Sequence, residues 1–247
     1  MLFWRGEGFS LEKLPADRSR VIYPAEPLPG LDDVDGHIRN ALLHPHDMEP
    51  LPALLQPDMK LTICFDDASL SLPKMRRPDI RQRIIEAVLD LAAAAGVDDI
   101  HIIAGLGLHR RMHDYELRHV RGDRIFDAFT PRGMLYQHDA EDTDNLAVLG
   151  DTEEGEVLEI SRRVAERDRV VYANVNQVAM AGGWKSLTTG VASYRCLSFQ
   201  HNAHPLQNTR SLMDRHHSDL HTSVWRMGKV LQDHGPKIFT VETTINN

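Results

Sequence analysis

A buried strand, a helix and a second buried strand follow one another near the middle of the chain, and this alternation restricts the fold more than any other feature. The apolar run Leu61–Phe65 predicts a strand, and Asp79 is placed to cap a helix from about Ile80 to Ala95. Gly96 would end this helix, and the apolar run Ile100–Ala104 follows it. A strand, a helix and a strand at this spacing form a βαβ unit, which predicts a parallel sheet.

The same alternation continues toward the C-terminus. The residue pattern predicts helices at Asp114–Val120, Val157–Glu166 and Asp219–Gln232, and strands at Met134–His138, Leu146–Leu149, Arg169–Val175 and Lys237–Thr243. The expected fold class is therefore α/β, with a parallel or mixed sheet, flanking helices and a Rossmann-like arrangement. Open α/β sheets bind ligands beyond the carboxyl ends of their strands, so the loops at those ends are the candidates for function.

Residues 1–58 differ from the rest because they are rich in proline. They predict an irregular arm, with short strands at Met1–Trp4 and Arg20–Tyr23 and a short helix at Asp35–Leu43. Residues 59–247 are then expected to form one α/β domain.

Composition narrows the function classes. The net charge of -8 argues against a nucleic-acid partner, which would require a basic face. No window approaches the ~20 apolar residues that span a bilayer, and no signal peptide is expected. The cysteines Cys64 and Cys196 form no CxxC pair, so a cytoplasmic location is the simplest expectation. The count of 14 histidines is unusual and first indicates metal or acid–base chemistry.

The loop Gly182-Gly183-Trp184-Lys185-Ser186 follows the strand expected at Arg169–Val175. Its glycines would let the backbone approach a ligand, and a helix start after them would offer N–H groups to a phosphate. Lys185 would be a phosphate contact or an attachment point. The GxxxxGK[ST] spacing of a P-loop is absent. The alternatives are a glycine turn with a surface lysine, and a Trp184 ring that packs on the core instead of stacking on a cofactor.

Two further loops contain histidines. His109, in Gly105-Leu106-Gly107-Leu108-His109-Arg110, would lie at the end of a strand, where it could act as a general base or form a hydrogen-bonded turn. His201, in His201-Asn202-Ala203-His204, offers an imidazole nitrogen to nickel, zinc or copper. Asp66-Asp67 after the first strand would either serve the same site or cap the loop.

The order of these motifs, GLHR, then GGxKS, then His201, resembles the nickel-pincer lactate racemase family. The stretch from His217 through Ile238–Asn246 is also similar to the segment that closes the first domain of that family. The resemblance covers roughly Lys60 to the C-terminus. It implies that this sequence contains the cofactor-anchoring domain but not the second domain, which closes over the substrate.

This resemblance implies a racemase or epimerase that acts on a 2-hydroxy acid through a nickel-pincer nucleotide. By position, Lys185 would join the pincer through a thioamide bond, and His201 would supply the remaining nickel ligand. His109 matches the histidine that takes the hydroxyl proton while the pincer takes a hydride from C2. The other residues implied to bind the cofactor are Gly182, Gly183, Trp184 and Ser186. The implied partners are a small hydroxy-acid substrate and the enzymes that make the cofactor.

The sequence departs from the family pattern at the second catalytic histidine. This residue stands ten positions before the lysine in the family, where this chain has Val175. Two-base racemisation therefore requires a substitute, and His113, His138 and His204 are the candidates from the sequence.

A second departure concerns the DxxRP motif of the family. Asp67 matches the aspartate, but the arginine is displaced, so that Arg76 or Arg77 could replace it only through a longer loop. A substrate carboxylate still requires a fork-shaped cation, so Asp67 and Arg77 are expected in the catalytic site. The alternative is that the arginine pair is a solvated surface. A substrate other than lactate, such as a larger hydroxy acid or a sugar acid, is expected.

Two other functions remain open. A zinc-dependent hydrolase would be favoured if His217 and His221 shared one face of a helix. A non-catalytic binding module of the same fold is favoured by the loss of the second histidine.

Overall fold

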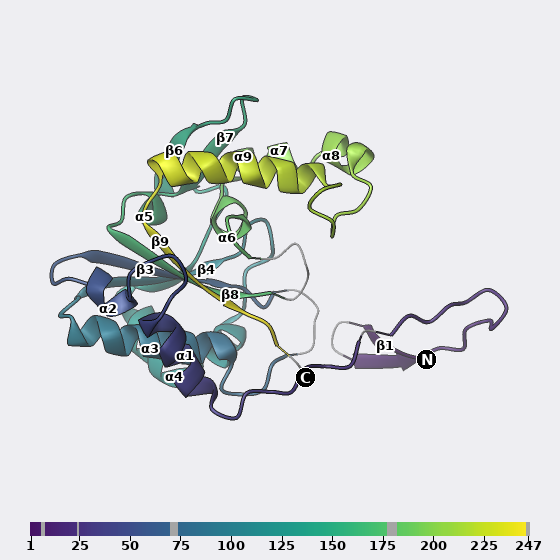
Figure 1. Ribbon diagram of the computed structural model, residues 1–247, viewed down its shortest axis with the longest axis horizontal. Coiled ribbons are helices and arrows are strands. Elements are labelled where there is room, and N and C mark those ends of the chain that lie inside the picture. Colours follow the sequence, from purple (N-terminus) through teal and green to yellow (C-terminus); the bar gives the residue numbers. More distant parts are fainter. Residues whose placement is uncertain (6–7, 24, 70–73, 177–181, 246–247) are drawn as a thin grey trace.

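Five parallel strands form the central sheet, in the order β5-β4-β3-β8-β9 (Figure 1). The computed structural model describes residues 1–5, 8–23, 25–69, 74–176 and 182–245. The strands of the sheet are β3 (Lys60–Asp66), β4 (Asp99–Gly105), β5 (Leu135–Gln137), β8 (Arg169–Val175) and β9 (Ile238–Thr243). The expected α/β class with a parallel sheet is confirmed.

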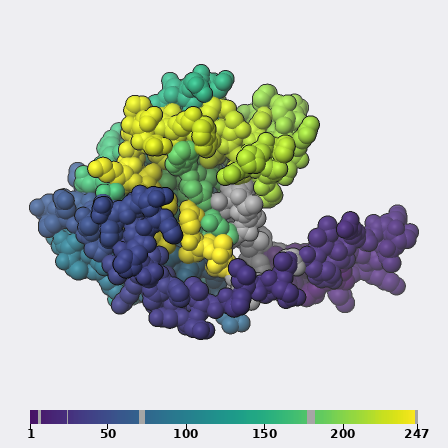
Figure 2. Space-filling view, viewed as in Figure 1, coloured from purple at the N-terminus to yellow at the C-terminus, as the bar shows by residue number. Residues whose placement is uncertain are grey.

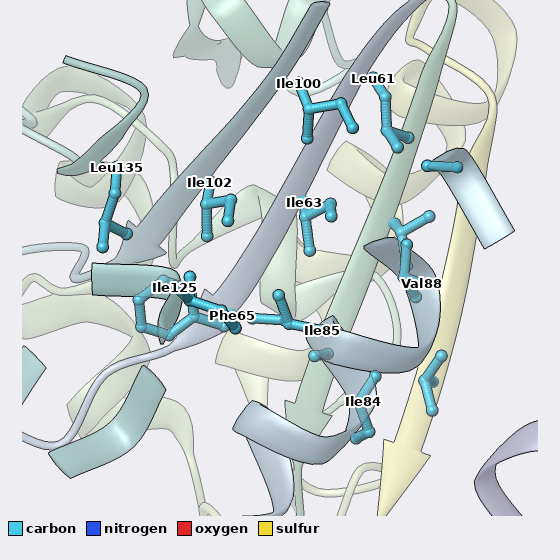
Figure 3. Packing of buried hydrophobic residues seen from close by; sticks show 14 of the residues in the cluster. Leu61, Ile63, Phe65, Ile84, Ile85, Val88, Ile100, Ile102, Ile125 and Leu135 are labelled. Carbon is cyan, nitrogen blue, oxygen red and sulfur yellow. The ribbon is translucent and has the colours of Figure 1, made fainter. Parts of the chain in front are cut away.

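Side chains of the sheet alternate between two buried faces. In β3, Ile63 and Phe65 belong to one core cluster and Cys64 to the other. Figure 3 shows Phe65 of β3 close to Ile85 of the first helix that follows it and to Ile125. A strand buried on both faces is apolar at almost every position, and β3 can therefore be recognised from the sequence alone.

Helices cover both faces of the sheet (Figure 1). They are α1 (Val34–Leu43), α2 (Leu51–Leu54), α3 (Ile80–Ala94), α4 (Asp114–Phe129), α5 (Arg162–Ala165), α6 (Lys185–Thr188), α7 (Tyr194–Gln200), α8 (Ala203–Asn208) and α9 (Asp219–His234), with 3-10 turns at Thr130–Arg132 and Thr143–Asn145. The four helices α1 to α4 lie on one side, and α9 lies on the other. Asp79 caps α3 as expected, since its side chain accepts from the amide of Arg81.

The helix expected at Val157–Glu166 is wrong. Val157–Ser161 is strand β7, which pairs antiparallel with β6 (Leu146–Asp151), and only Arg162–Ala165 is helical. Gly155, at φ +76°, allows the tight turn between the two strands. Strand pairing across this turn buries Val157, Leu158 and Ile160, which outweighs the local helical pattern.

The N-terminal residues divide into an exposed arm and a packed part. Strand β1 (Leu2–Arg5) pairs with β2 (Gly8–Leu11), and the arm that carries this hairpin projects from the body (Figure 2). The short strand expected at Arg20–Tyr23 is absent from the described structure. Helices α1 and α2 pack on the body, where they bury Ile38 and Leu51 in the same core cluster as Ile63.

None of the helices in the described part of the chain combines the length and the apolar character that crossing a membrane requires.

Candidate functional site

Polar side chains meet where β3, β8 and β9 end. Asp66 is the last residue of β3, Asn174 lies next to the end of β8, and Glu242 lies next to the end of β9. The register pairs Asn174 with Glu242. His109 reaches the same edge from the loop after β4, and Lys185 reaches it from the loop after β8. Parallel strands present their carboxyl ends on one edge, so residues far apart in the sequence meet there.

His109 and Asp67 form a hydrogen-bonded pair. The Nδ1 atom of His109 lies 3.1 Å from Oδ2 of Asp67, and the histidine side chain is 46% exposed while the aspartate side chain is 10% exposed. A carboxylate can only accept, so Nδ1 carries the hydrogen and the neutral ring keeps its lone pair on Nε2. The hydrogen bond to Asp67 raises the pKa of His109, against the opposing effects of partial burial and of the Lys185 charge.

Asp66 is held from two sides. Its Oδ1 accepts from the hydroxyl of Tyr172 at 3.2 Å, and its Oδ2 accepts from the backbone amide of Val175 at 2.6 Å. Burial raises the pKa of Asp66 to about 6, although these two hydrogen bonds and the charge of Arg81 lower it. This carboxyl therefore titrates close to neutral pH.

Arg81 fixes the turn that presents both aspartates. Its guanidinium forms two hydrogen bonds to Asp79, at 2.8 and 2.7 Å, and its Nη1 donates to the carbonyl oxygens of Asp66 and Asp67, both at 2.8 Å. Arg81 is buried together with Asp79. Sequence reasoning missed this role, and the signal was an arginine two residues after the capping aspartate.

The backbone of the glycine loop is clamped by Glu242. Its Oε1 accepts from the amide of Gly183 at 3.0 Å, and its Oε2 accepts from the side-chain amides of Asn174 at 2.5 Å and Asn176 at 3.0 Å. Gly182 has φ +87°, and a Cβ there would lie 2.5 Å from Oδ1 of Asn176 and 2.6 Å from Oε2 of Glu242. Only glycine fits this position, which brings the loop against the strand ends.

Lys185 begins α6 directly after this loop and is half-buried. Partial burial lowers the pKa of Lys185, while the carboxylates of Asp66 and Asp67 act in the opposite direction. The amine donates no hydrogen bond to any residue in the described ranges. A half-buried amine with a reduced proton affinity is suited to react as a nucleophile.

His201 lies at the C-terminal end of α7, with much of the residue exposed. Its Nδ1 is 3.3 Å from the carbonyl oxygen of Leu197, so Nδ1 donates and Nε2 is left with its lone pair. Burial of part of the ring lowers the pKa of His201, and the charges of Lys185 and His109 lower it further. The charges of Lys185 and His109 thus both act on His201.

Ser186 and Trp184 are the other two residues of the glycine loop that were expected to bind the cofactor. Ser186 is buried beneath the loop, where its hydroxyl donates to Oδ1 of Asn174 at 3.2 Å. Trp184 packs against α9, since a Cβ at Gly228 would overlap its ring. This contact matches the packing alternative for Trp184.

Arg77 is not brought to the other site residues. Its guanidinium donates to the carbonyl of Arg118 at 3.0 Å and lies 3.5 Å from Asp123, both on α4. Arg110, the residue after His109, forms two hydrogen bonds to Glu116, and the charge of Asp67 acts on it.

The candidate substitutes for the second histidine are engaged elsewhere. His113 stacks on the ring of Tyr115, His138 is buried with Nε2 at 2.9 Å from the carbonyl of Ala192, and His204 lies 3.9 Å from Asp219. None of them is shown to replace a base at position 175.

His217 and His221 do not share a face of a helix, so the condition that would favour a zinc-dependent hydrolase is not met. His217 precedes the capping residue of α9 and pairs with Asp214 at 2.6 Å, while His221 lies inside the helix. In the part of the chain that the structure describes, no three His, Cys, Asp or Glu side chains gather as a metal site would require.

The sequence matches the family model of the lactate racemase N-terminal domain over residues 6–214. No curated protein matches it. Among solved structures, the lactate racemase apoprotein from Thermoanaerobacterium thermosaccharolyticum superposes with a TM-score of 0.70 at 18% identity, over 99% of this chain and 55% of that one. A protein from Thermotoga maritima superposes with a TM-score of 0.64 at 17% identity, over 86% of this chain and 51% of that one.

The chain thus spans about half the length of both solved relatives. At such low identities the structural likeness shows the fold, and the family follows from the sequence match. The chain belongs to the lactate racemase N-terminal domain family.

Proposed function

We propose that this chain is the cofactor-anchoring part of an enzyme that racemises or epimerises a 2-hydroxy acid with a nickel-pincer nucleotide. The observation that carries the proposal is the convergence of Lys185, His109 and His201, whose charges act on one another at one edge of the sheet. When bound, the pincer would supply the acceptor and donor of a hydride at C2 of the substrate.

The residues at this edge fit such a group. Lys185 has no hydrogen-bond partner among the described residues, which suits an amine that becomes part of a covalent link. His201 keeps a lone pair on Nε2, as a metal ligand must. No described atom would lie within 4 Å of a Cβ at Gly183, so the loop is open at that position.

His109 would act as the proton acceptor for the substrate hydroxyl. Its Nε2 is the free nitrogen, and Asp67 both orients the ring and stabilises the imidazolium that forms when the proton arrives. Asp67 therefore contributes as the positioning partner of the base.

The substrate of this site is proposed to differ from lactate. Arg77 lies against α4, so the fork-shaped cation expected for a substrate carboxylate is not provided by that residue in this structure. We take residues 59–247 as the anchoring domain and residues 1–58 as the arm that accompanies it. The enzymes that make the pincer are the proposed partners, and a cytoplasmic location stays a prediction.

The test is an intact-mass measurement of the chain after co-expression with the enzymes that make the pincer. The expected result is an adduct on Lys185, confirmed by peptide mapping, and nickel that copurifies in about equal amount. Lys185→Arg should lose the adduct, while His201→Ala should keep the adduct and lose nickel. A wild-type chain without any adduct would contradict the proposal.

A second candidate is a binding module that has the fold without the chemistry, and Val175 at the position of the second histidine favours it. This candidate predicts that the co-expressed chain carries no adduct, so the same mass spectrum separates the two functions.

A further inference from the structure

The position where the family has its second histidine is occupied here by an apolar side chain with a carboxyl group beside it. Val175 is 4% exposed, and its backbone amide donates to Oδ2 of Asp66 at 2.6 Å. Asp66 therefore lies directly at the end of β8 where that base is missing. Asp66 is the last residue of a different strand, β3, and lies 109 residues before Val175 in the sequence.

We propose that Asp66 is a second proton-transfer group of this site and takes the place of the missing histidine. The inference rests on the proposed function, because a second base has meaning only for a reaction that handles a hydroxyl proton from two orientations of the substrate. The step is a proton transfer alone: the O–H bond of the substrate breaks, an O–H bond forms on Asp66, and the carboxylate becomes neutral. The reverse transfer returns the proton to the substrate oxygen.

The geometry leaves Asp66 able to do this. Each carboxylate oxygen accepts one hydrogen bond, from Tyr172 and from Val175, so a lone pair remains on each. The charge of Asp66 acts on Lys185, the residue around which the site is built. His109 with Asp67 and Asp66 with Tyr172 are thus two hydrogen-bonded proton-transfer pairs that both act electrostatically on one lysine.

The surroundings of Asp66 bring its pKa close to neutral pH. Burial raises the pKa of Asp66 to about 6, near enough to neutral pH for both protonation states to be accessible. The titratable and charged groups that face it are Cys64, Asp67, Arg81, Arg121, Tyr172 and Lys185.

The first test needs no cofactor. Infrared titration of the protein labelled with 13C-aspartate should show a carboxyl with a midpoint near pH 6 that is missing in Asp66→Asn. The same midpoint should remain in the matched control Asp168→Asn. In the wild type, the Asp168 carboxylate accepts a hydrogen bond from the backbone amide of Lys60, at the opposite end of β3. Tyr172→Phe should move the midpoint upward, because the Tyr172 hydroxyl stabilises the ionised form. The absence of an Asp66-dependent midpoint between about pH 5 and 7 would overturn the inference.

The second test uses protein that carries the Lys185 adduct. The rate is measured with the first of D-lactate, D-malate and D-mandelate that the loaded wild type racemises. Asp66→Asn should reduce kcat by about 100-fold or more with KM within about threefold, and Asp66→Glu should restore part of the rate. The limb of the pH–rate profile near pH 6 should disappear in Asp66→Asn. In Tyr172→Phe it should shift to higher pH.

These outcomes separate the two proposals. A wild type without adduct contradicts the proposed function and the inference together. A loaded, active wild type with an equally active Asp66→Asn, or with an unchanged limb in both variants, overturns the inference and leaves the proposed function standing. Formation of the adduct in Asp66→Asn shows that this variant is folded.

Discussion

The amide of Gly183 donates to Oε1 of Glu242 at 3.0 Å, across 59 residues of sequence. This bond ties the loop that presents Lys185 to the last strand of the sheet. The same carboxylate accepts from Asn174 and Asn176 on β8 and just beyond it, so one side chain joins two strand ends and the loop. The position of the lysine therefore depends on a residue close to the C-terminal end of the chain.

Glu242→Gln should loosen the loop without unfolding the protein. The amide of glutamine retains one acceptor oxygen but no charge, and a charge-assisted hydrogen bond contributes about 1–2 kcal/mol more than its neutral counterpart at a partly exposed site. Hydrogen exchange of the Gly183 amide, followed by NMR, should accelerate by about tenfold. Glu154→Gln in the β6–β7 turn is the control and should leave this exchange unchanged. Equal exchange in both variants would show that Glu242 does not hold the loop.

The two glycines of the loop should differ in their tolerance of alanine. Both have positive φ, +87° at Gly182 and +60° at Gly183, and each substitution therefore costs about 1 kcal/mol of backbone strain. A Cβ at Gly182 also meets Asn176 and Glu242, whereas one at Gly183 meets no described atom within 4 Å. Urea denaturation should show that Gly182→Ala is less stable than Gly183→Ala by roughly 1–3 kcal/mol. The reverse order would refute the packing described for Gly182.

Much of this architecture was predictable because its strands are buried on both faces. The strands β3, β4 and β8 are nearly continuous apolar runs, and Asp79 has the signature of a helix cap, so the sheet and α3 follow from the sequence. The error at Val157–Glu166 arose where pairing with a distant segment decides the structure. A hairpin is stabilised by its partner strand, and the sequence of one strand does not contain that information.

The site was predictable only where a residue type reveals its chemistry. Lys185, His109 and His201 stand out in short motifs, and in the structure the charges of Lys185 and His109 act on His201. Asp66 and Glu242 resemble ordinary residues at strand ends, and their roles depend on contacts made across the sheet. Arg77 is the opposite case. Its residue type and its motif suggested a role in the site, but its side chain lies against α4.

Asp67→Asn should lower the pKa of His109. The hydrogen bond to Asp67 is the main cause that raises this pKa, and the amide removes both the negative charge and the favoured partner of an imidazolium. NMR titration of the imidazole resonances should show a lower midpoint than in the wild type. Asp139→Asn, a surface partner of Arg111, is the control. An unchanged midpoint for His109 would exclude Asp67 as its partner in solution.

The same variant should change the pH dependence of folding. A folded-state pKa above the unfolded value means that His109 stabilises the fold fully below the unfolded pKa, about 6.5, and loses this contribution as pH rises through the folded pKa. Asp67→Asn should therefore reduce the fall in unfolding free energy above about pH 6.5. Denaturation midpoints measured from pH 5 to 9 give this difference directly.

Lys185 should be acylated at lower pH than the exposed lysines. Partial burial lowers its pKa, so a larger fraction of the amine is neutral and nucleophilic at a given pH. Trace labelling with acetic anhydride from pH 7 to 11, read by peptide mass spectrometry, gives a midpoint for each lysine that is independent of how easily the reagent reaches it. The midpoint of Lys185 should lie below that of Lys237, which is exposed. In Asp67→Asn it should fall further, because the Asp67 carboxylate stabilises the ammonium form, and a rise in this variant would contradict the charge arrangement of the site.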